Sequence, residues 1–315
     1  MLGVWPALPI VIWNTENFTS DEDNIVAALE HRDRVCEVKL RHLTRLQLEK
    51  IVPSMQESFP ALTKLLIESY QSRRDEQPVL PDSFLGGSAP RLRFLYLATI
   101  SFRGLPKVLL SASNLLYLFL HGIPSGYIPP EMVAALSALT KLEDMRLVFG
   151  YPGPDSDSDS DLGGRATSQP TRCFLPALKS LELRGDGEYL DDFVARIDVP
   201  SINHIQIEFY NRPFFLSDFF HFPQFIGRLE KFRSFDYARI NVSAHSTQDA
   251  GPSFSPKMDA RSSRSVGFEL LMRHRWTTSV SGRGLQHLIS TPLQHRKIRI
   301  FFLEWILGFA SRIQR

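Results

Sequence analysis

Cysteine is scarce in this 315-residue chain, which contains only Cys36 and Cys173. Two thiols so far apart in the sequence support neither a disulfide framework nor a zinc site, because both need several cysteines at short spacings. Low cysteine content is typical of reducing compartments, so we expect a cytoplasmic or nuclear protein.

The sequence also lacks a charge excess and a long apolar run. Its 36 Lys and Arg nearly cancel its 34 Asp and Glu, so a general attraction to nucleic acid or to an anionic membrane is not indicated. The apolar run Phe301–Ala310 contains Glu304 and is shorter than the roughly 20 residues that a membrane-spanning helix needs. The apolar N-terminus has no preceding basic residue and no small-residue cleavage site, which argues against a secretory signal. We expect neither nucleic acid nor a membrane as partner.

Motifs of enzyme active sites are missing as well. The sequence contains no phosphate-binding loop, no dinucleotide-binding glycine-rich turn, no nucleophile elbow and no His-Glu-x-x-His motif. Its nine histidines are scattered, without the spacing of metal ligands. We therefore expect a protein that is not an enzyme, with no catalytic residues, no metal and no cofactor.

The range 150–171 carries aspartates that alternate with serines over Asp155–Asp161. A calcium loop of the EF-hand type needs Gly at its sixth position and Glu at its twelfth, where this chain has Ser160 and Ala166. We interpret the range as a flexible acidic insertion. Two serines in it have acidic residues at the first and third following positions, which makes them candidate phosphorylation sites for an acidophilic kinase: Ser156 and Ser158.

What the sequence has in abundance is one repeated pattern, Leu-x-x-Leu-x-Leu with conservative replacements. Its second half alternates with period two, as in a short strand that buries every second side chain. Most spacings between copies lie in or near the ~20–29 residues of a leucine-rich repeat. Six copies begin at Val35, Leu62, Leu92, Leu115, Leu142 and Leu178, and two looser copies begin at Ile202 and Phe232.

Segments with apolar residues at helical spacing lie between these strands, at 24–31, 130–139, 188–197 and 215–229. Strand and helix in alternation predict an α/β leucine-rich-repeat solenoid, a curved horseshoe with a parallel sheet on its concave face and helices on its convex face. We expect the solenoid to occupy residues 1–242, with Leu8–Trp13 as a first strand or cap. A flexible loop over 243–265 and an irregular segment over 266–315 would follow; Val266–Leu271 is a further strand candidate, and a degenerate last repeat with a cap helix is one interpretation of that segment.

Several runs resemble the leucine-rich-repeat region of fungal F-box proteins, among them WPALPIVIW, NIVAALEHRDRVCEVKL and GYIPPEMVAALSALTKLEDMRLVF. The resemblance covers roughly residues 5–242, and it implies the substrate receptor of a cullin-type ubiquitin ligase. In such receptors an F-box module docks the Skp adaptor while the repeats hold a protein substrate. The F-box module itself is not found in this sequence, which leaves the Skp adaptor open as a partner. An adaptor or structural scaffold unconnected to ubiquitination is the first alternative, and an enzyme with a site on the repeat-edge loops is the second.

If the repeated leucines point inward, the residues between them form a column on the concave face. The column consists of Lys39, Leu66, Tyr96, Phe119, Arg146, Glu182, Gln206 and Asp236. Exposed aromatic residues beside an arginine are typical of the centre of a protein interface. The alternative is that these rings only stack on one another along the sheet. The candidate partner-binding residues are Phe94, Tyr96, Tyr117, Phe119, His121 and Arg146.

Overall fold

The three-dimensional structure is a computed structural model of the whole chain. The residues that it describes are 8–14, 22–70, 78–102, 105–123, 130–149, 172–185, 187–210, 221–229, 237–245 and 267–275. The acidic range 150–171, with Ser156 and Ser158, lies outside these residues, as does the apolar run Phe301–Ala310. Within the described part of the chain, no helix has both the length and the apolar character needed to cross a membrane.

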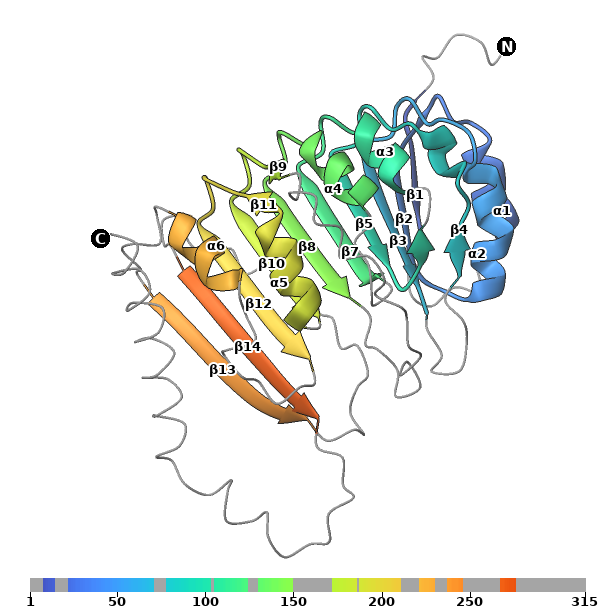
Figure 1. The fold of residues 1–315 in the computed structure, drawn as a ribbon. Helices are drawn as coiled ribbons and strands as arrows, with labels where there is room; N and C mark the ends of the chain where they lie inside the picture. The colour runs from blue at the N-terminus through green and yellow to red at the C-terminus, as the bar shows by residue number, and fades with distance from the viewer. Residues whose placement is uncertain are drawn as a thin grey trace, which may run out of the picture.

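Ten strands form one long sheet in which every neighbouring pair is parallel (Figure 1). The first eight lie in chain order. In order across the sheet, the strands are β1 (Ile10–Trp13), β2 (Val35–Leu43), β3 (Lys64–Ser69), β5 (Phe94–Ala98), β7 (Tyr117–Ile123), β8 (Asp144–Phe149), β10 (Ser180–Gly185), β12 (His204–Tyr210), β14 (Gly267–Arg275) and β13 (Tyr237–His245).

Short helices and two small sheets connect successive strands. The small parallel sheets pair β4 (Val79–Leu80) with β6 (Ser101–Phe102) and β9 (Cys173–Phe174) with β11 (Ile197–Asp198). The helices are α1 (Glu22–Leu29), α2 (Arg45–Ile51), α3 (Leu105–Ser111), α4 (Pro130–Ser137), α5 (Gly187–Ala195) and α6 (Phe222–Arg228), with 3-10 turns η1 (Val52–Met55) and η2 (Phe84–Gly87). Figure 1 shows α3 to α6 along the same side of the sheet. The sequence expectation of an α/β protein with a parallel sheet is therefore confirmed.

The core lies between the helices and the inward positions of the repeat. One continuous apolar cluster contains helix residues such as Leu48 and Phe193 together with the strand residues. Burying a leucine stabilises a fold by roughly 1.5–3 kcal/mol, so this periodic set supplies a large part of the stability. The inward strand residues, each at most 2% exposed, are Val38, Leu40, Leu65, Ile67, Leu95, Leu97, Leu118, Leu120, Met145, Leu147, Leu181, Leu183, Ile205 and Ile207.

Local signals explain where two of the helices begin. Thr44 and Gln47 form a capping box: the Thr44 hydroxyl accepts from the Gln47 backbone N–H, and Gln47 Oε1 accepts from the Thr44 N–H at 2.9 Å. These bonds satisfy N–H groups that the first turn of α2 leaves without helical partners. The buried carboxylate of Asp191, on α5, accepts from the backbone N–H groups of His221 and Phe222 at the start of α6. This contact fixes α6 against α5.

The C-terminal end of the sheet does not follow the chain order that the repeat predicts. The start of the eighth copy, Phe232, lies outside the described residues. The strand next to β12 is β14, and β13 pairs only with the far side of β14. β14 covers the strand candidate at Val266–Leu271, beginning at Gly267 and continuing to Arg275. β13 ends at His245, three residues into the range 243–265.

Candidate functional site: the outer face of the sheet

The outer face is the side of the ten-stranded sheet that carries the residues between the inward leucines. Strand register places Lys39, Leu66, Tyr96, Phe119, Arg146, Glu182 and Gln206 in one unbroken row, each the Cα partner of the next. The row begins one strand earlier than predicted, at Trp13. Asp236, its predicted last member, lies outside the described residues, and the place beside Gln206 belongs to Glu269 of β14. The structure thus brings seven of the eight predicted residues into line.

Five predicted residues on β5 and β7 form an aromatic cluster: Phe94, Tyr96, Tyr117, Phe119 and His121. The rings of Tyr96 and Phe119 stack with their centroids 4.4 Å apart and an interplanar angle of 13°. Phe94 and Tyr117 meet at 6.1 Å in a tilted arrangement, and Phe119 lies parallel to His121 at 6.4 Å. Such pairs contribute ~0.5–1.5 kcal/mol beyond area burial. Cross-strand stacking is therefore realised, and Tyr117 still exposes 41% of its surface.

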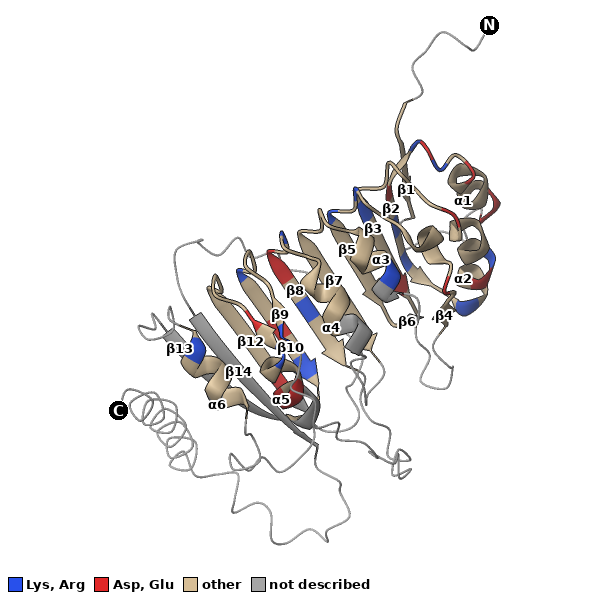
Figure 2. Ribbon diagram, turned by 45° about the horizontal axis from the view of Figure 1, so that its top comes forward, with Lys and Arg blue, Asp and Glu red and all other residues tan. Residues whose placement is uncertain are grey.

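The aromatic cluster carries no charge near neutral pH. Burial lowers the pKa of His121 to about 4, because the imidazolium form loses its hydration there, and the positive Arg184 acts in the same direction. Burial, assisted by Glu68, raises the pKa of Tyr96 and keeps its hydroxyl protonated. Figure 2 shows β5 and β7 without Lys, Arg, Asp or Glu, between strands that carry charges of both signs.

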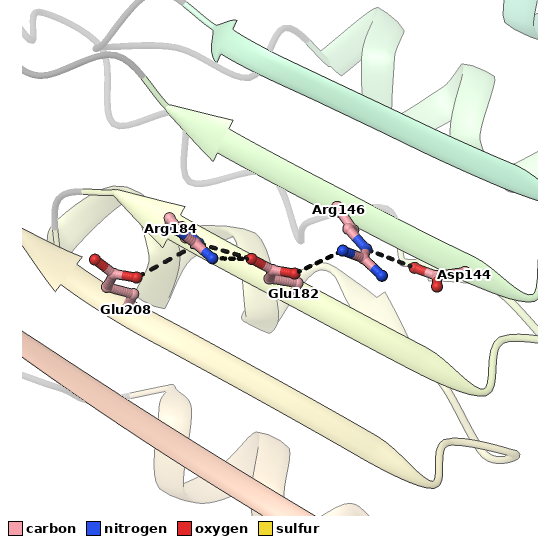
Figure 3. Close-up of polar contacts among 5 residues, drawn as sticks. All are labelled: Asp144, Arg146, Glu182, Arg184 and Glu208. Carbon is pink, nitrogen blue, oxygen red and sulfur yellow. Dashed lines mark hydrogen bonds and ion pairs between the residues drawn. The ribbon is translucent and has the colours of Figure 1, made fainter. Parts of the chain in front are cut away.

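The outer face of β8, β10 and β12 carries a charged ladder of five residues (Figure 3). It runs Asp144, Arg146, Glu182, Arg184 and Glu208. Arg146 lies 3.4 Å from Asp144 and 3.5 Å from Glu182. Arg184 donates from Nε to Glu182 Oε1 at 2.7 Å and lies 3.4 Å from Glu208. The guanidinium of Arg146, predicted as a partner-binding group, is thus already engaged by two carboxylates.

Burial of the ladder costs desolvation free energy, because its charged groups lose contact with water. Glu208 is 1% exposed, and the side chain of Arg184 is 18% exposed. The pKa of Asp144 is raised, first by burial, although Arg146 opposes that shift. Buried carboxylates of this kind need the neighbouring guanidinium groups to remain charged. The ladder is therefore chiefly a structural element that holds three strands in register.

A cationic cluster occupies the opposite flank of the aromatic cluster, on β2 and β3, and consists of Lys39, Arg41 and Lys64. The Lys39 ammonium lies over the Trp13 ring at 4.6 Å, and that of Lys64 over the Phe94 ring at 5.3 Å. Arg41 lies 4.0 Å from Glu68. The pKa of Lys39 is lowered, first by burial and then by the nearby charges of Arg41 and Lys64. The three cations thus repel one another.

Comparisons of the chain with protein-family models, with curated proteins and with solved structures gave no match. Across the described ranges, no group of three or more His, Cys, Asp or Glu residues is placed to hold a metal ion. Burial raises the pKa of the Cys173 thiol to about 12, which makes it a poor nucleophile.

Sequence reasoning missed the cationic cluster and the ladder as units. The row of residues was visible from the repeat, since each copy contributes one residue at a constant position. The contacts of Lys39 with Trp13 and of Arg184 with Glu208 depend on strand register. Alternation of Lys39 with Arg41, and of Glu182 with Arg184, was the available signal that charged side chains share the outer face.

Proposed function

We propose that this chain is a leucine-rich-repeat solenoid that binds a protein partner on the outer face of its sheet and catalyses no reaction. The observation that carries the proposal is the alignment of the aromatic cluster on two adjacent strands at the middle of that face. The periodic leucine core beneath supports the repeat interpretation.

Physical arguments favour binding by this cluster. Its rings are held by mutual stacking and by rigid strands, so little side-chain entropy is lost when a partner covers them. Aromatic side chains are enriched among the few central interface residues whose truncation costs about 2 kcal/mol or more of binding free energy. The aromatic cluster is uncharged, and charged residues border it on both sides. This is the distribution of an apolar interface centre with a polar rim.

The cellular role that we propose is substrate recognition within an F-box-type ubiquitin ligase receptor, in the cytoplasm or nucleus. This part rests on the resemblance of the repeats to fungal F-box proteins. The outer face would hold the substrate, and the Skp adaptor would bind elsewhere. This cellular role requires that the full chain retain the Skp adaptor in a pull-down. Without retention, the function reduces to that of an adaptor or scaffold unconnected to ubiquitination.

Affinity purification with mass spectrometry tests the recognition function. The bait is the full chain, compared with the double variant Tyr96→Ala/Phe119→Ala. Its matched control is Leu110→Ala/Phe174→Ala, which removes two exposed apolar side chains outside the ten-stranded sheet. We expect the recovered amount of at least one partner to fall tenfold or more with the outer-face variant and to stay unchanged with the control. Equal recovery by both variants, with circular dichroism showing both folded, contradicts the proposal.

A further inference from the structure

The cationic cluster holds more positive charge than its one ion pair, between Arg41 and Glu68, neutralises within the described part of the chain. Among the described residues, no carboxylate forms an ion pair with the ammonium of Lys39 or Lys64, and the two ammonium groups lie over the rings of Trp13 and Phe94. Glu37 is the Cα partner of Lys64 but forms no ion pair with it. Arg41 has one carboxylate contact, at the long distance of 4.0 Å, and its buried Nε has no hydrogen-bond partner.

The opposite flank of the aromatic cluster differs in this respect. In the charged ladder, each guanidinium lies between two carboxylates at 3.5 Å or less. The ladder therefore has its cations satisfied from within, whereas the cationic cluster does not. An anion brought by a partner would be attracted to one side of the aromatic cluster only.

The cationic cluster and the aromatic cluster form one continuous surface. In the row on the outer face, Lys39 is next to Leu66, and Tyr96 and Phe119 follow on the next two strands. Phe94 links the two clusters, because the Lys64 ammonium lies over its ring and the same ring packs against Tyr117. Lys39 and Phe119 are three strand spacings apart, or about 14 Å. Four or five residues of an extended peptide span that distance.

We propose that the partner presents an acidic segment, whose aspartate or glutamate side chains bind Lys39, Arg41 and Lys64 while adjacent apolar side chains pack on the aromatic cluster. The inference rests on the proposed recognition function and names the chemistry of its ligand. Partner carboxylates would offset the repulsion among these cations and form charge-assisted hydrogen bonds with them. At the edge of the sheet, Trp13 is 65% exposed and extends the apolar surface beside Lys39.

A protein ligand fits this surface better than a nucleic acid. A polynucleotide needs a row of cations that follows several phosphates. Here three cations are clustered, with Glu37 and Glu68 on the same two strands. The adjoining surface is apolar, and the chain as a whole carries a net charge of only +2. One or two carboxylates beside leucine or phenylalanine match such a surface.

Selection from a random peptide display library on the full chain tests the inference without knowledge of the partner. We expect the selected peptides to be enriched in Asp and Glu next to Leu, Phe, Tyr or Trp. A synthetic peptide of that kind should lose at least tenfold in affinity for Lys39→Glu/Lys64→Glu, measured by fluorescence anisotropy. Lys107→Glu, which changes an exposed lysine of α3, should bind as the parent chain does. Replacing Asp with Asn in the peptide should also weaken binding tenfold, and raising the salt from 50 to 300 mM should reduce it.

The outcomes separate this inference from the function on which it rests. Selected peptides that need Tyr96 and Phe119 but show no acidic enrichment, or bind Lys39→Glu/Lys64→Glu unchanged, overturn the acidic ligand and leave outer-face recognition standing. Peptides that bind Tyr96→Ala/Phe119→Ala as tightly as the parent chain overturn the recognition function. A selection that enriches no sequence contradicts both.

Discussion

Replacing Arg184 with methionine should destabilise the fold strongly, because Arg184 separates two buried carboxylates. Its guanidinium contacts Glu182 at 2.7 Å and Glu208 at 3.4 Å, and Glu208 is 1% exposed. Methionine retains much of the aliphatic packing and removes only the charge and its hydrogen bonds. Breaking a buried ion pair from one side costs ~3–5 kcal/mol, since an uncompensated charge remains. The 18% exposure of Arg184 admits some solvent screening, so we expect about 3 kcal/mol, at the lower end.

The assay is urea unfolding at pH 7, with Arg45→Met as the matched control. Arg45 forms an ion pair of similar length with Glu49, at 2.8 Å, but both side chains are about half exposed. Exposed pairs of this type contribute ~0.3–0.5 kcal/mol. A loss for Arg184→Met no greater than that for Arg45→Met would refute the view that the charged ladder holds the three strands together.

Two further predictions concern stability. His121 should make the fold sensitive to mild acid. Its pKa is about 4 in the folded chain, against an ordinary value of 6.5. Below pH 6.5 the unfolded chain therefore binds the proton more readily, and the stability falls as the pH drops. Linkage gives a loss of about 2 kcal/mol between pH 7.5 and pH 5, which unfolding at both pH values should show in the parent chain and not in His121→Asn. Gly86→Ala should lower the free energy of unfolding more than Gly87→Ala does, by roughly 1–3 kcal/mol. Both glycines have positive φ, but a Cβ at Gly86 would lie 2.8 Å from the Ser58 backbone nitrogen. The nearest neighbour of a Cβ at Gly87 would be 3.8 Å away. Equal melting temperatures for the two glycine variants would contradict that difference.

The apolar periodicity of the sequence was enough to predict the class of fold and the row on the outer face. Leu95 and Leu97 alternate with Tyr96, and a parallel sheet with constant register repeats that arrangement on each strand. Periodicity carries no information about which strands are neighbours, so the insertion of β14 between β12 and β13 was not foreseen. The short helix α2 was missed although Thr44 and Gln47 carry a capping-box signal, because seven residues give little apolar periodicity.

The polar half of the candidate site was harder to predict, for a related reason. Arg184 and Glu208 are 24 positions apart and meet only because β10 and β12 pair in register. Whether Arg146 is available to a partner depends on two carboxylates from β8 and β10. Ion pairs of this kind depend on strand register, and a slip of one residue between two strands would abolish them.

Site-specific photocrosslinking at position 117 tests whether a partner binds to the outer face of the sheet. Tyr117 is 41% exposed and is the most exposed member of the aromatic cluster. A benzoylphenylalanine in its place retains an aromatic ring. We expect a partner to be crosslinked from position 117. The double variant Tyr96→Ala/Phe119→Ala should abolish this product, and the same probe at the exposed position 110 of α3 should not yield it. Crosslinking of the same partner from position 110, with none from position 117, would contradict recognition by the outer face.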